Sequence, residues 1–217
     1  MKIIYLTAGH GGFVNGINYT EPRWGKFYHF NEEGKRVFSA YEGETNRIFA
    51  KKFMKAMQDT DLVVMQMHHD FKDLHHITQI QKANAHFIRN KPDKALWFSM
   101  HSNALGIASE GASNPTRGYS VWTSLGETQS DKIASAVFEA VAPICQKYKM
   151  PVLKSVWSDG DVDYEANFDE LALTFMPAVL NELGFFTNIV DAKLLKNESF
   201  QNEVVQAYKT AVLAYFQ

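Results

Sequence analysis

Residues 95–104 read ALWFSMHSNA, an apolar run that ends in a histidine followed by small polar residues. The run predicts a strand over residues 95–100 that ends at His101. Other short apolar runs predict four more strands, over residues 3–6, 61–65, 118–123 and 177–180. The strand that ends at His101 therefore has candidate neighbours on both sides of it in the sequence.

The segments between these strands carry apolar residues at helical spacing. They predict helices over residues 45–57, 77–88, 131–148 and 200–216. Strands that alternate with helices favour an α/β fold, in which helices flank a mostly parallel central sheet. In open sheets of this kind, functional sites gather outside the carboxyl ends of the strands.

Length and composition limit the possible classes of protein. The chain has 217 residues, 46% hydrophobic and 21% charged, which is the balance of an ordinary globular domain. No linker or repeat divides it, so we expect a single domain over residues 1–217. A net charge of -2 gives no basic patch for nucleic acid. No apolar stretch reaches the roughly 18 residues of a membrane span, and the first apolar run is too short for a signal peptide.

Four polar residues lie where a site is expected. His10, His101 and Glu182 follow the ends of predicted strands, and Glu42 stands just before a predicted helix. A catalytic zinc takes three ligands from histidine and carboxylate and keeps one position open. A further carboxylate is needed to move protons. Each residue also has an ordinary explanation: a lone histidine is more often structural, and Glu42 and Glu44 suit the N-terminus of a helix. On their own, these residues indicate no more than a possible metal hydrolase.

Four segments, in order along the chain, resemble the zinc-dependent N-acetylmuramoyl-L-alanine amidase family, which includes bacterial autolysins and phage endolysins. They are TAGHGG at residues 7–12, EGETN with AKKF at 42–53, FSMHSNA at 98–104 and PAVLNELGFFTN at 177–188. The resemblance implies a phosphorylase/hydrolase-like α/β fold and a catalytic amidase domain over residues 1–217, with no separate cell-wall-binding domain. It also implies hydrolysis of the amide bond between N-acetylmuramic acid (MurNAc) and L-alanine in bacterial peptidoglycan.

The resemblance also assigns roles to residues. It makes His10, Glu42 and His101 the ligands of one Zn²⁺ ion per chain, and Glu182 the catalytic acid and base. The family's ligand precedes an asparagine by four residues and an alanine by eight. Glu42 satisfies both spacings through Asn46 and Ala50, whereas Glu44 satisfies neither.

The chain departs from the family pattern in three places. Thr7 and Ala8 replace an aspartate and a proline, and Gln79 stands where a basic residue is common. The segment at residues 13–41 is longer than usual and rich in aromatic residues. Its aromatic side chains favour a hydrophobic cluster beneath a long loop, with stacking on sugar rings as the alternative. The histidines of residues 68–76 are expected in a solvated loop, with a second metal site as the alternative.

Two other functions fit parts of the pattern. One is a zinc carboxypeptidase-like peptidase, and the other is a catalytically silent peptidoglycan-binding module on the same fold. The expected partner is bacterial peptidoglycan, and the sequence leaves the oligomeric state open. As the sequence stands, we expect a cytoplasmic protein that reaches the wall at lysis, as a phage lysin does. If a signal peptide has been removed, the location is periplasmic or secreted.

Overall fold

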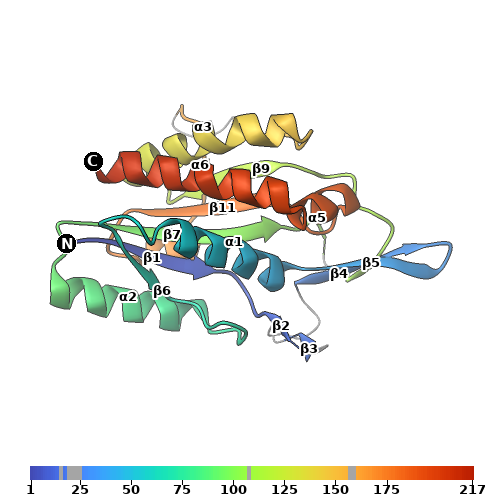
Figure 1. The fold of residues 1–217 in the computed structure, drawn as a ribbon, viewed down its shortest axis with the longest axis horizontal. Coiled ribbons are helices and arrows are strands. Elements are labelled where there is room, and N and C mark those ends of the chain that lie inside the picture. The colour runs from blue at the N-terminus through green and yellow to red at the C-terminus, as the bar shows by residue number, and fades with distance from the viewer. Residues whose placement is uncertain (15–16, 19–25, 107–108, 156–159) are drawn as a thin grey trace.

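The computed structural model describes residues 1–14, 17–18, 26–106, 109–155 and 160–217 (Figure 1). A six-stranded sheet forms its centre, in the order β10-β9-β11-β7-β1-β6. The strands are β1 (Lys2–Ala8), β6 (Val63–Gln66), β7 (Lys94–Asn103), β9 (Tyr119–Thr123), β10 (Tyr164–Glu165) and β11 (Ala178–Phe185). All neighbouring pairs run parallel except β9 and β11, which are antiparallel. The predicted mostly parallel α/β sheet is therefore confirmed.

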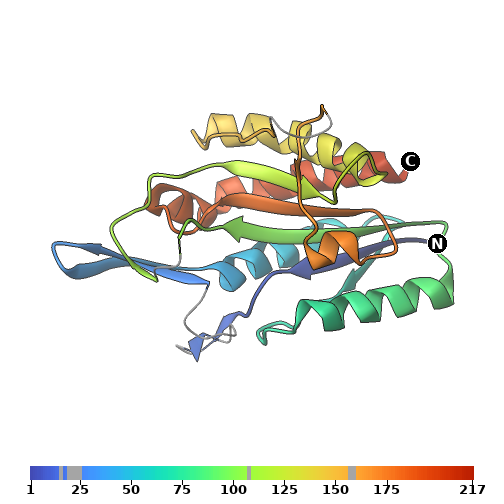
Figure 2. The same ribbon diagram turned by 180° about the vertical axis from the view of Figure 1, so that it is seen from behind.

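Helices cover both faces of this sheet. Helices α1 (Glu42–Ala56), α3 (Ser130–Lys147) and α6 (Glu198–Phe216) share one apolar cluster with the sheet. Helices α2 (His76–Asn90) and the short α4 (Asp169–Ala172) share a second cluster with the other face. The last helix, α5 (Ile189–Leu195), follows β11. In Figure 1, α1 and α6 lie in front of the sheet. In the opposite view of Figure 2, α2 and α4 lie in front of it.

Alternate residues of the central strands enter the two clusters, because successive side chains of a strand point to opposite faces. Leu96, Phe98 and Met100 of β7 belong to the first cluster, and Ala95 and Trp97 belong to the second. Both faces are thus apolar along most of the strand, which explains why the central strands read as unbroken apolar runs.

Three boundaries differ from the predictions in ways that matter for the site. His101 and Glu182 lie inside β7 and β11 rather than beyond their ends, and they are directly paired across the two strands. Glu42 is the first residue of α1, which begins one turn earlier than predicted and has no side-chain cap. The apolar pattern missed these extensions because each begins at a polar residue, Glu42, His101 or Asn181.

The aromatic segment forms a small separate sheet that extends away from the central one (Figure 1). Strands β4 (Phe27–Glu32), β5 (Lys35–Tyr41) and β8 (Glu110–Gly111) make it, and β2 (Phe13–Val14) pairs with β3 (Ile17–Asn18) nearby in the sequence. Tyr28 and Phe30 are buried in a satellite cluster with Phe186, as the preferred interpretation predicted. Tyr19 and Trp24 lie outside the described residues. Within the described residues, no helix is both long and apolar enough to span a membrane.

A buried carboxylate ties the end of β11 to the strand beside it. Asp191 is fully buried and accepts hydrogen bonds from the backbone N–H groups of Gly118 (2.9 Å) and Phe185 (3.2 Å). Arg117 forms an ion pair with it at 2.8 Å. Gly184 has a φ of 70°, and a side chain there would press on Asp191 and Met150. Asp191 therefore fixes the backbone just beyond Glu182.

Replacing Asp191 with alanine should lower the free energy of unfolding by about 3 kcal/mol, because it leaves a guanidinium and two buried N–H groups without their acceptor. Urea denaturation measures the change. Lys193→Ala, at an exposed position of the same helix, should change stability by no more than about 0.5 kcal/mol. Equal effects of the two substitutions would contradict the role given to Asp191.

Candidate metal centre and active site

The polar residues of the site lie on the face of the sheet that α2 covers, next to the apolar residues of that face. Tyr5 and Trp97 belong to the α2 side of the core. Two residues further along each strand, Thr7 and Ser99 point to the same face, and His101 follows Ser99. Glu182 is paired with His101. The face therefore changes from apolar to polar towards the carboxyl ends of the parallel strands, where a site is expected in a fold of this class.

Three of the four predicted residues meet at this end of the sheet. One ligand atom from each of His10, Glu42 and His101 lies within 4.8 Å of the others. The Glu42 carboxylate is placed between the two rings, with Oε2 3.4 Å from His10 Nε2 and Oε1 3.1 Å from His101 Nδ1. Two imidazoles and a carboxylate at this spacing form a donor set that fits a single divalent ion such as zinc.

Glu42 is held in place by its own helix and by β7. Asn46, one turn along α1, donates its amide to Glu42 Oε1 (3.3 Å) and to the carbonyl of Gly9 (3.2 Å). The backbone N–H of Ser102 lies 3.4 Å from the same carboxylate oxygen. The asparagine at the family spacing thus contacts the glutamate directly. Glu44 instead forms an ion pair with Lys196 at 3.5 Å, away from this group.

Two glycines allow the backbone segments of the site to approach each other. A Cβ atom on Gly9 would lie 2.0 Å from Cε1 of His101, and one on Gly43 would lie 1.8 Å from the carbonyl oxygen of Gly11. No larger residue fits either position without moving the ring or the loop. His10 itself adopts a left-handed conformation with a φ of 61°. Glycine is thus required where the loop after β1 packs on α1.

Burial and neighbouring charges set the protonation of this group. Burial lowers the pKa of His10 to about 4, against the pull of Glu42, and so favours the neutral imidazole that binds metals. Burial opposes ionisation of Glu42, but His10 and His101 outweigh it and lower its pKa to about 2. Burial also disfavours charge on His101, yet Glu170 and Glu42 raise its pKa well above the usual value. Carboxylates on two sides make the centre attractive to a cation.

Glu170 is a site residue that sequence reasoning missed. It lies on α4 and accepts hydrogen bonds from His101 Nε2 (3.2 Å) and from the indole N–H of Trp97 (3.1 Å). Burial opposes its charge, but His101 dominates and lowers its pKa to about 2. Its sequence neighbourhood, FDELALTF, lies outside the family-like segments and looks like the acidic first turn of a helix. No local signal distinguishes it.

Glu182, the fourth predicted residue, lines the cleft beside the three possible ligands. A cavity of about 460 Å³ is lined by Glu182, Lys26, His10 and His101, among others. Glu182 Oε2 is buried and has no hydrogen-bond partner among the described residues. Burial raises its pKa to about 8, against the attraction of His101. A carboxyl group that can hold or release a proton near neutral pH suits general acid and base catalysis.

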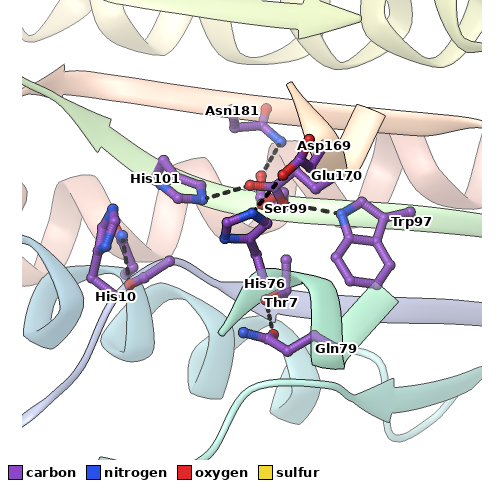
Figure 3. Close-up of polar contacts among 12 residues, drawn as sticks. Thr7, His10, His76, Gln79, Trp97, Ser99, His101, Asp169, Glu170 and Asn181 are labelled. Atoms are coloured by element: carbon purple, nitrogen blue, oxygen red, sulfur yellow. Dashed lines mark hydrogen bonds and ion pairs between the residues drawn. The ribbon is translucent and has the colours of Figure 1, made fainter. Parts of the chain in front are cut away.

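A second cavity, of about 570 Å³, adjoins the first and has Thr7, Gln79 and Trp97 in its lining. Both cavities reach His10, His101 and Glu170. His76 on α2 and Asp169 on α4 also line the cleft, and their side chains are 2.7 Å apart. This pair links the two elements on that side of the sheet (Figure 3).

Of the histidines expected in a solvated loop, His75 and His76 are exposed, whereas His68 is buried. His68 is 4% exposed, so it is not part of a solvated loop, and burial lowers its pKa to about 4. Its loop is held by Arg47, whose guanidinium donates to the carbonyls of His69 and Lys72. His75 caps α2 through the backbone N–H of Ile77. In the described part of the chain, none of these histidines joins a group with metal-binding spacing.

Two departures from the family pattern contact each other. Thr7 Oγ1 donates to Gln79 Oε1 at 2.6 Å, and Gln79 Nε2 donates to the carbonyl of Leu74 at 2.9 Å. Both side chains are buried. Where the family pattern has an acid and a basic residue, this chain has a neutral hydrogen-bonded pair. The pair joins β1 to α2.

Comparison with known proteins agrees with this geometry. The sequence pattern of the family described as N-acetylmuramoyl-L-alanine amidase matches residues 4–214. The fold resembles the catalytic domain of CwlV, an N-acetylmuramoyl-L-alanine amidase from Bacillus (Paenibacillus) polymyxa var. colistinus (TM-score 0.71, 22% identity, 100% of this chain and 98% of that chain). It also resembles an N-acetylmuramoyl-L-alanine amidase from Clostridium difficile 630 (TM-score 0.68, 23% identity, 99% and 96%).

A third similar structure is the amidase AmiC2 of Nostoc punctiforme (TM-score 0.66, 17% identity, 99% of this chain and 97% of that chain). No protein of curated function matches the chain by sequence. At these identities the structures establish the fold, and the match to the family pattern establishes the family.

The paired substitutions predict strong coupling between Thr7 and Gln79. Thr7→Asp and Gln79→Arg should each destabilise the protein, because each buries a charge without its partner. The double variant should recover on the order of 2 kcal/mol of that loss. A double-mutant cycle of unfolding free energies measures the recovery. If the losses of unfolding free energy in the two single variants simply add in the double variant, a charged pair cannot replace Thr7 and Gln79.

Proposed function

The chain belongs to the family of N-acetylmuramoyl-L-alanine amidases, and on this premise we propose that His10, Glu42 and His101 bind one Zn²⁺ ion and that Glu182 is the catalytic acid and base. The reaction is hydrolysis of the amide bond between MurNAc and L-alanine in peptidoglycan. The observation that carries the proposal is the convergence of three ligand atoms within 4.8 Å at the carboxyl end of the sheet.

The donor set supports a catalytic rather than a structural metal. Structural zinc sites are closed by four protein ligands, whereas catalytic sites use three and leave a position for water or substrate. Here three donors meet beside a cleft that substrate can enter. A bound zinc ion supplies Lewis-acid chemistry: it polarises the amide carbonyl and lowers the pKa of water.

The residues of the chain supply orientation and proton transfer. The cleft beside His10 and His101 receives the lactyl amide, and Glu182 faces that space with one carboxylate oxygen that has no described partner. Glu182 accepts a proton from the attacking water. It then delivers the proton to the nitrogen of the departing L-alanine, so the amine leaves neutral.

Glu170 has a supporting role in this proposal. With Nδ1 of His101 directed at Glu42, the opposite ring nitrogen Nε2 donates to Glu170. A carboxylate on the outer nitrogen of a ligand histidine fixes the tautomer and the orientation of the ring. Trp97 holds Glu170 in turn at 3.1 Å. Glu170 is therefore a positioning residue that acts through His101.

The substrate lies outside the cytoplasmic membrane, so the enzyme acts at the cell wall. Release at lysis, as for a phage lysin, and secretion through a removed signal both meet this requirement and stay predictions. The assignment of residues 1–217 to one catalytic domain also stays a prediction.

Mass spectrometry of products from purified peptidoglycan tests the function. The zinc-loaded protein should release stem peptides with a free L-alanine amino end, and a chelator should stop the release until zinc is restored. Glu182→Gln should lower turnover by at least about 10³-fold while zinc stays bound. Cleavage within the peptide would indicate the carboxypeptidase-like alternative. Zinc binding without any product would indicate a silent binding module.

Two glutamates of α1 provide a matched control for the ligand assignment. Glu42→Gln should reduce zinc binding to far below one ion per chain. Glu44→Gln should leave zinc content and activity close to those of the parent protein, because Glu44 pairs with Lys196 instead. The reverse outcome would move the ligand to Glu44.

Glu170→Gln should weaken zinc binding by about 10- to 100-fold, because the amide accepts more weakly from His101. Competition with a chromophoric chelator measures the affinity, and ¹⁵N NMR of the His101 ring reports whether Nε2 still carries the proton. Asp169→Asn, one residue away and paired with His76, is the control and should leave both measurements unchanged. Unaltered affinity and tautomer in the Glu170 variant would remove its positioning role.

A further inference from the structure

Three aspartates form a separate acidic group at the other end of the sheet. Asp131 lies in the first turn of α3, and Asp161 and Asp163 lie directly before β10. One carboxylate oxygen from each lies within 4.8 Å of the others. Beside Asp131, Ser130 Oγ accepts a hydrogen bond from the N–H of Ala178, where β11 begins. The group therefore lies where β11 starts, whereas His101 pairs with Glu182 further along that strand.

Asp163 is the buried member of this group. Its side chain is 1% exposed, and its Oδ2 accepts a short hydrogen bond from the hydroxyl of Thr123. Its Oδ1 is buried and has no hydrogen-bond partner among the described residues. A buried carboxylate oxygen without a partner loses its hydration and gains nothing in return. This buried oxygen points to a bound group as its partner.

The surroundings of Asp163 indicate that the bound group is positively charged. Burial raises the pKa of Asp163 to about 7, and the carboxylates of Asp161 and Asp131 add to the rise. Asp161 and Asp131 carry charges of the same sign as Asp163. A cation between the three carboxylates relieves both the repulsion and the lost hydration.

We propose that Asp131, Asp161 and Asp163 bind one Ca²⁺ ion. The donors are carboxylate oxygens only, which hard cations prefer over the nitrogen donors that suit zinc. Calcium binds oxygen at about 2.3–2.6 Å, so ligands on opposite sides of the ion are at most about 5 Å apart. One carboxylate oxygen from each aspartate lies within 4.8 Å of the others, which is inside this limit.

The choice of calcium over magnesium rests on the number and the environment of the ligands. Magnesium keeps several waters and is usually held by one or two carboxylates, whereas calcium accepts more protein oxygens in irregular geometry. Here three carboxylates converge, and one of them is buried away from solvent. The site is separate from the amidase centre and does not depend on the proposed zinc chemistry.

A bound ion would join three parts of the fold. Asp131 belongs to α3, Asp161 and Asp163 lead into the edge strand β10, and Thr123 connects Asp163 to the end of β9. The strand β10 contains only two residues and pairs with β9 alone. An ion at its start would stabilise the edge of the sheet from which the chain continues to α4 and Glu170.

Titration calorimetry of the zinc-loaded protein with CaCl₂, in calcium-depleted buffer without chelator, tests the site. One Ca²⁺ ion should bind per chain with a Kd of about 10⁻⁴ M or tighter, and saturating Ca²⁺ should raise the Tm by several degrees. MgCl₂ should bind at least tenfold more weakly. Asp163→Asn and Asp161→Asn should each weaken Ca²⁺ binding at least tenfold.

Three variants test whether Ca²⁺ binds at the three aspartates and not elsewhere on the protein. The amide in Asp163→Asn has the shape of a protonated carboxyl, so this variant should fold and should lack only the calcium-dependent rise in Tm. Glu139→Gln removes an exposed acid from the same helix as Asp131 and should bind Ca²⁺ normally. Glu42→Gln should also bind Ca²⁺ normally, which separates this site from the amidase centre.

The wild-type titration decides the proposal whatever the variants do. Absence of heat and of a Tm shift up to about 10 mM Ca²⁺ would overturn it, since a site weaker than that is not a calcium site of the usual range. Equal binding of Mg²⁺ and Ca²⁺ would overturn the choice of ion. Loss of Ca²⁺ binding in Glu42→Gln alone would assign the binding to the amidase centre.

Discussion

The site depends on one buried carboxylate, Glu42, placed between two imidazoles. Glu42 is 2% exposed, and a carboxylate without partners at that depth would cost several kcal/mol. Its hydrogen bonds and its contacts with the histidines offset this cost only if three elements approach one another closely. These elements are helix α1, strand β7 and the loop that follows β1. Gly9 and Gly43 permit that approach, because a Cβ on either would overlap its neighbour. The position of Glu42 therefore fixes how three separate elements pack.

The same constraint extends outward from the ligands. His101 lies between Glu42 and Glu170. Glu170 in turn accepts a hydrogen bond from the indole N–H of Trp97. On the far side of the sheet end, Asp191 fixes the backbone that follows Glu182. Glu42 contacts both histidines, and His101 contacts Glu170, so these residues form a connected network rather than a set of isolated pairs. Such networks favour one geometry strongly, because a half-satisfied arrangement is costly.

The sequence predicted most of the fold, and it pointed to the residues of the proposed centre for identifiable reasons. Unbroken apolar runs such as residues 95–100 indicate buried strands, and ordered family-like segments point to His10, Glu42, His101 and Glu182. It did not predict that His101 and Glu182 are paired inside strands, because apolar periodicity stops where a strand turns polar. Glu170 was invisible for another reason. Its role comes from tertiary packing of α4 on β7, and local sequence holds no trace of that contact.

The neutral pair of Thr7 and Gln79 shows how such a site can diverge while the backbone stays in place. At 22% identity to the catalytic domain of CwlV, most side chains differ, yet the fold superposes with a TM-score of 0.71. A buried charge cannot be lost alone, since its partner would remain unpaired. A neutral pair that bonds each other, as Thr7 and Gln79 do at 2.6 Å, leaves no buried charge unpaired. Thr7 and Gln79 line the cleft, so a substrate meets an uncharged pair there. Divergence at this site is therefore expected in coupled pairs around an unaltered centre.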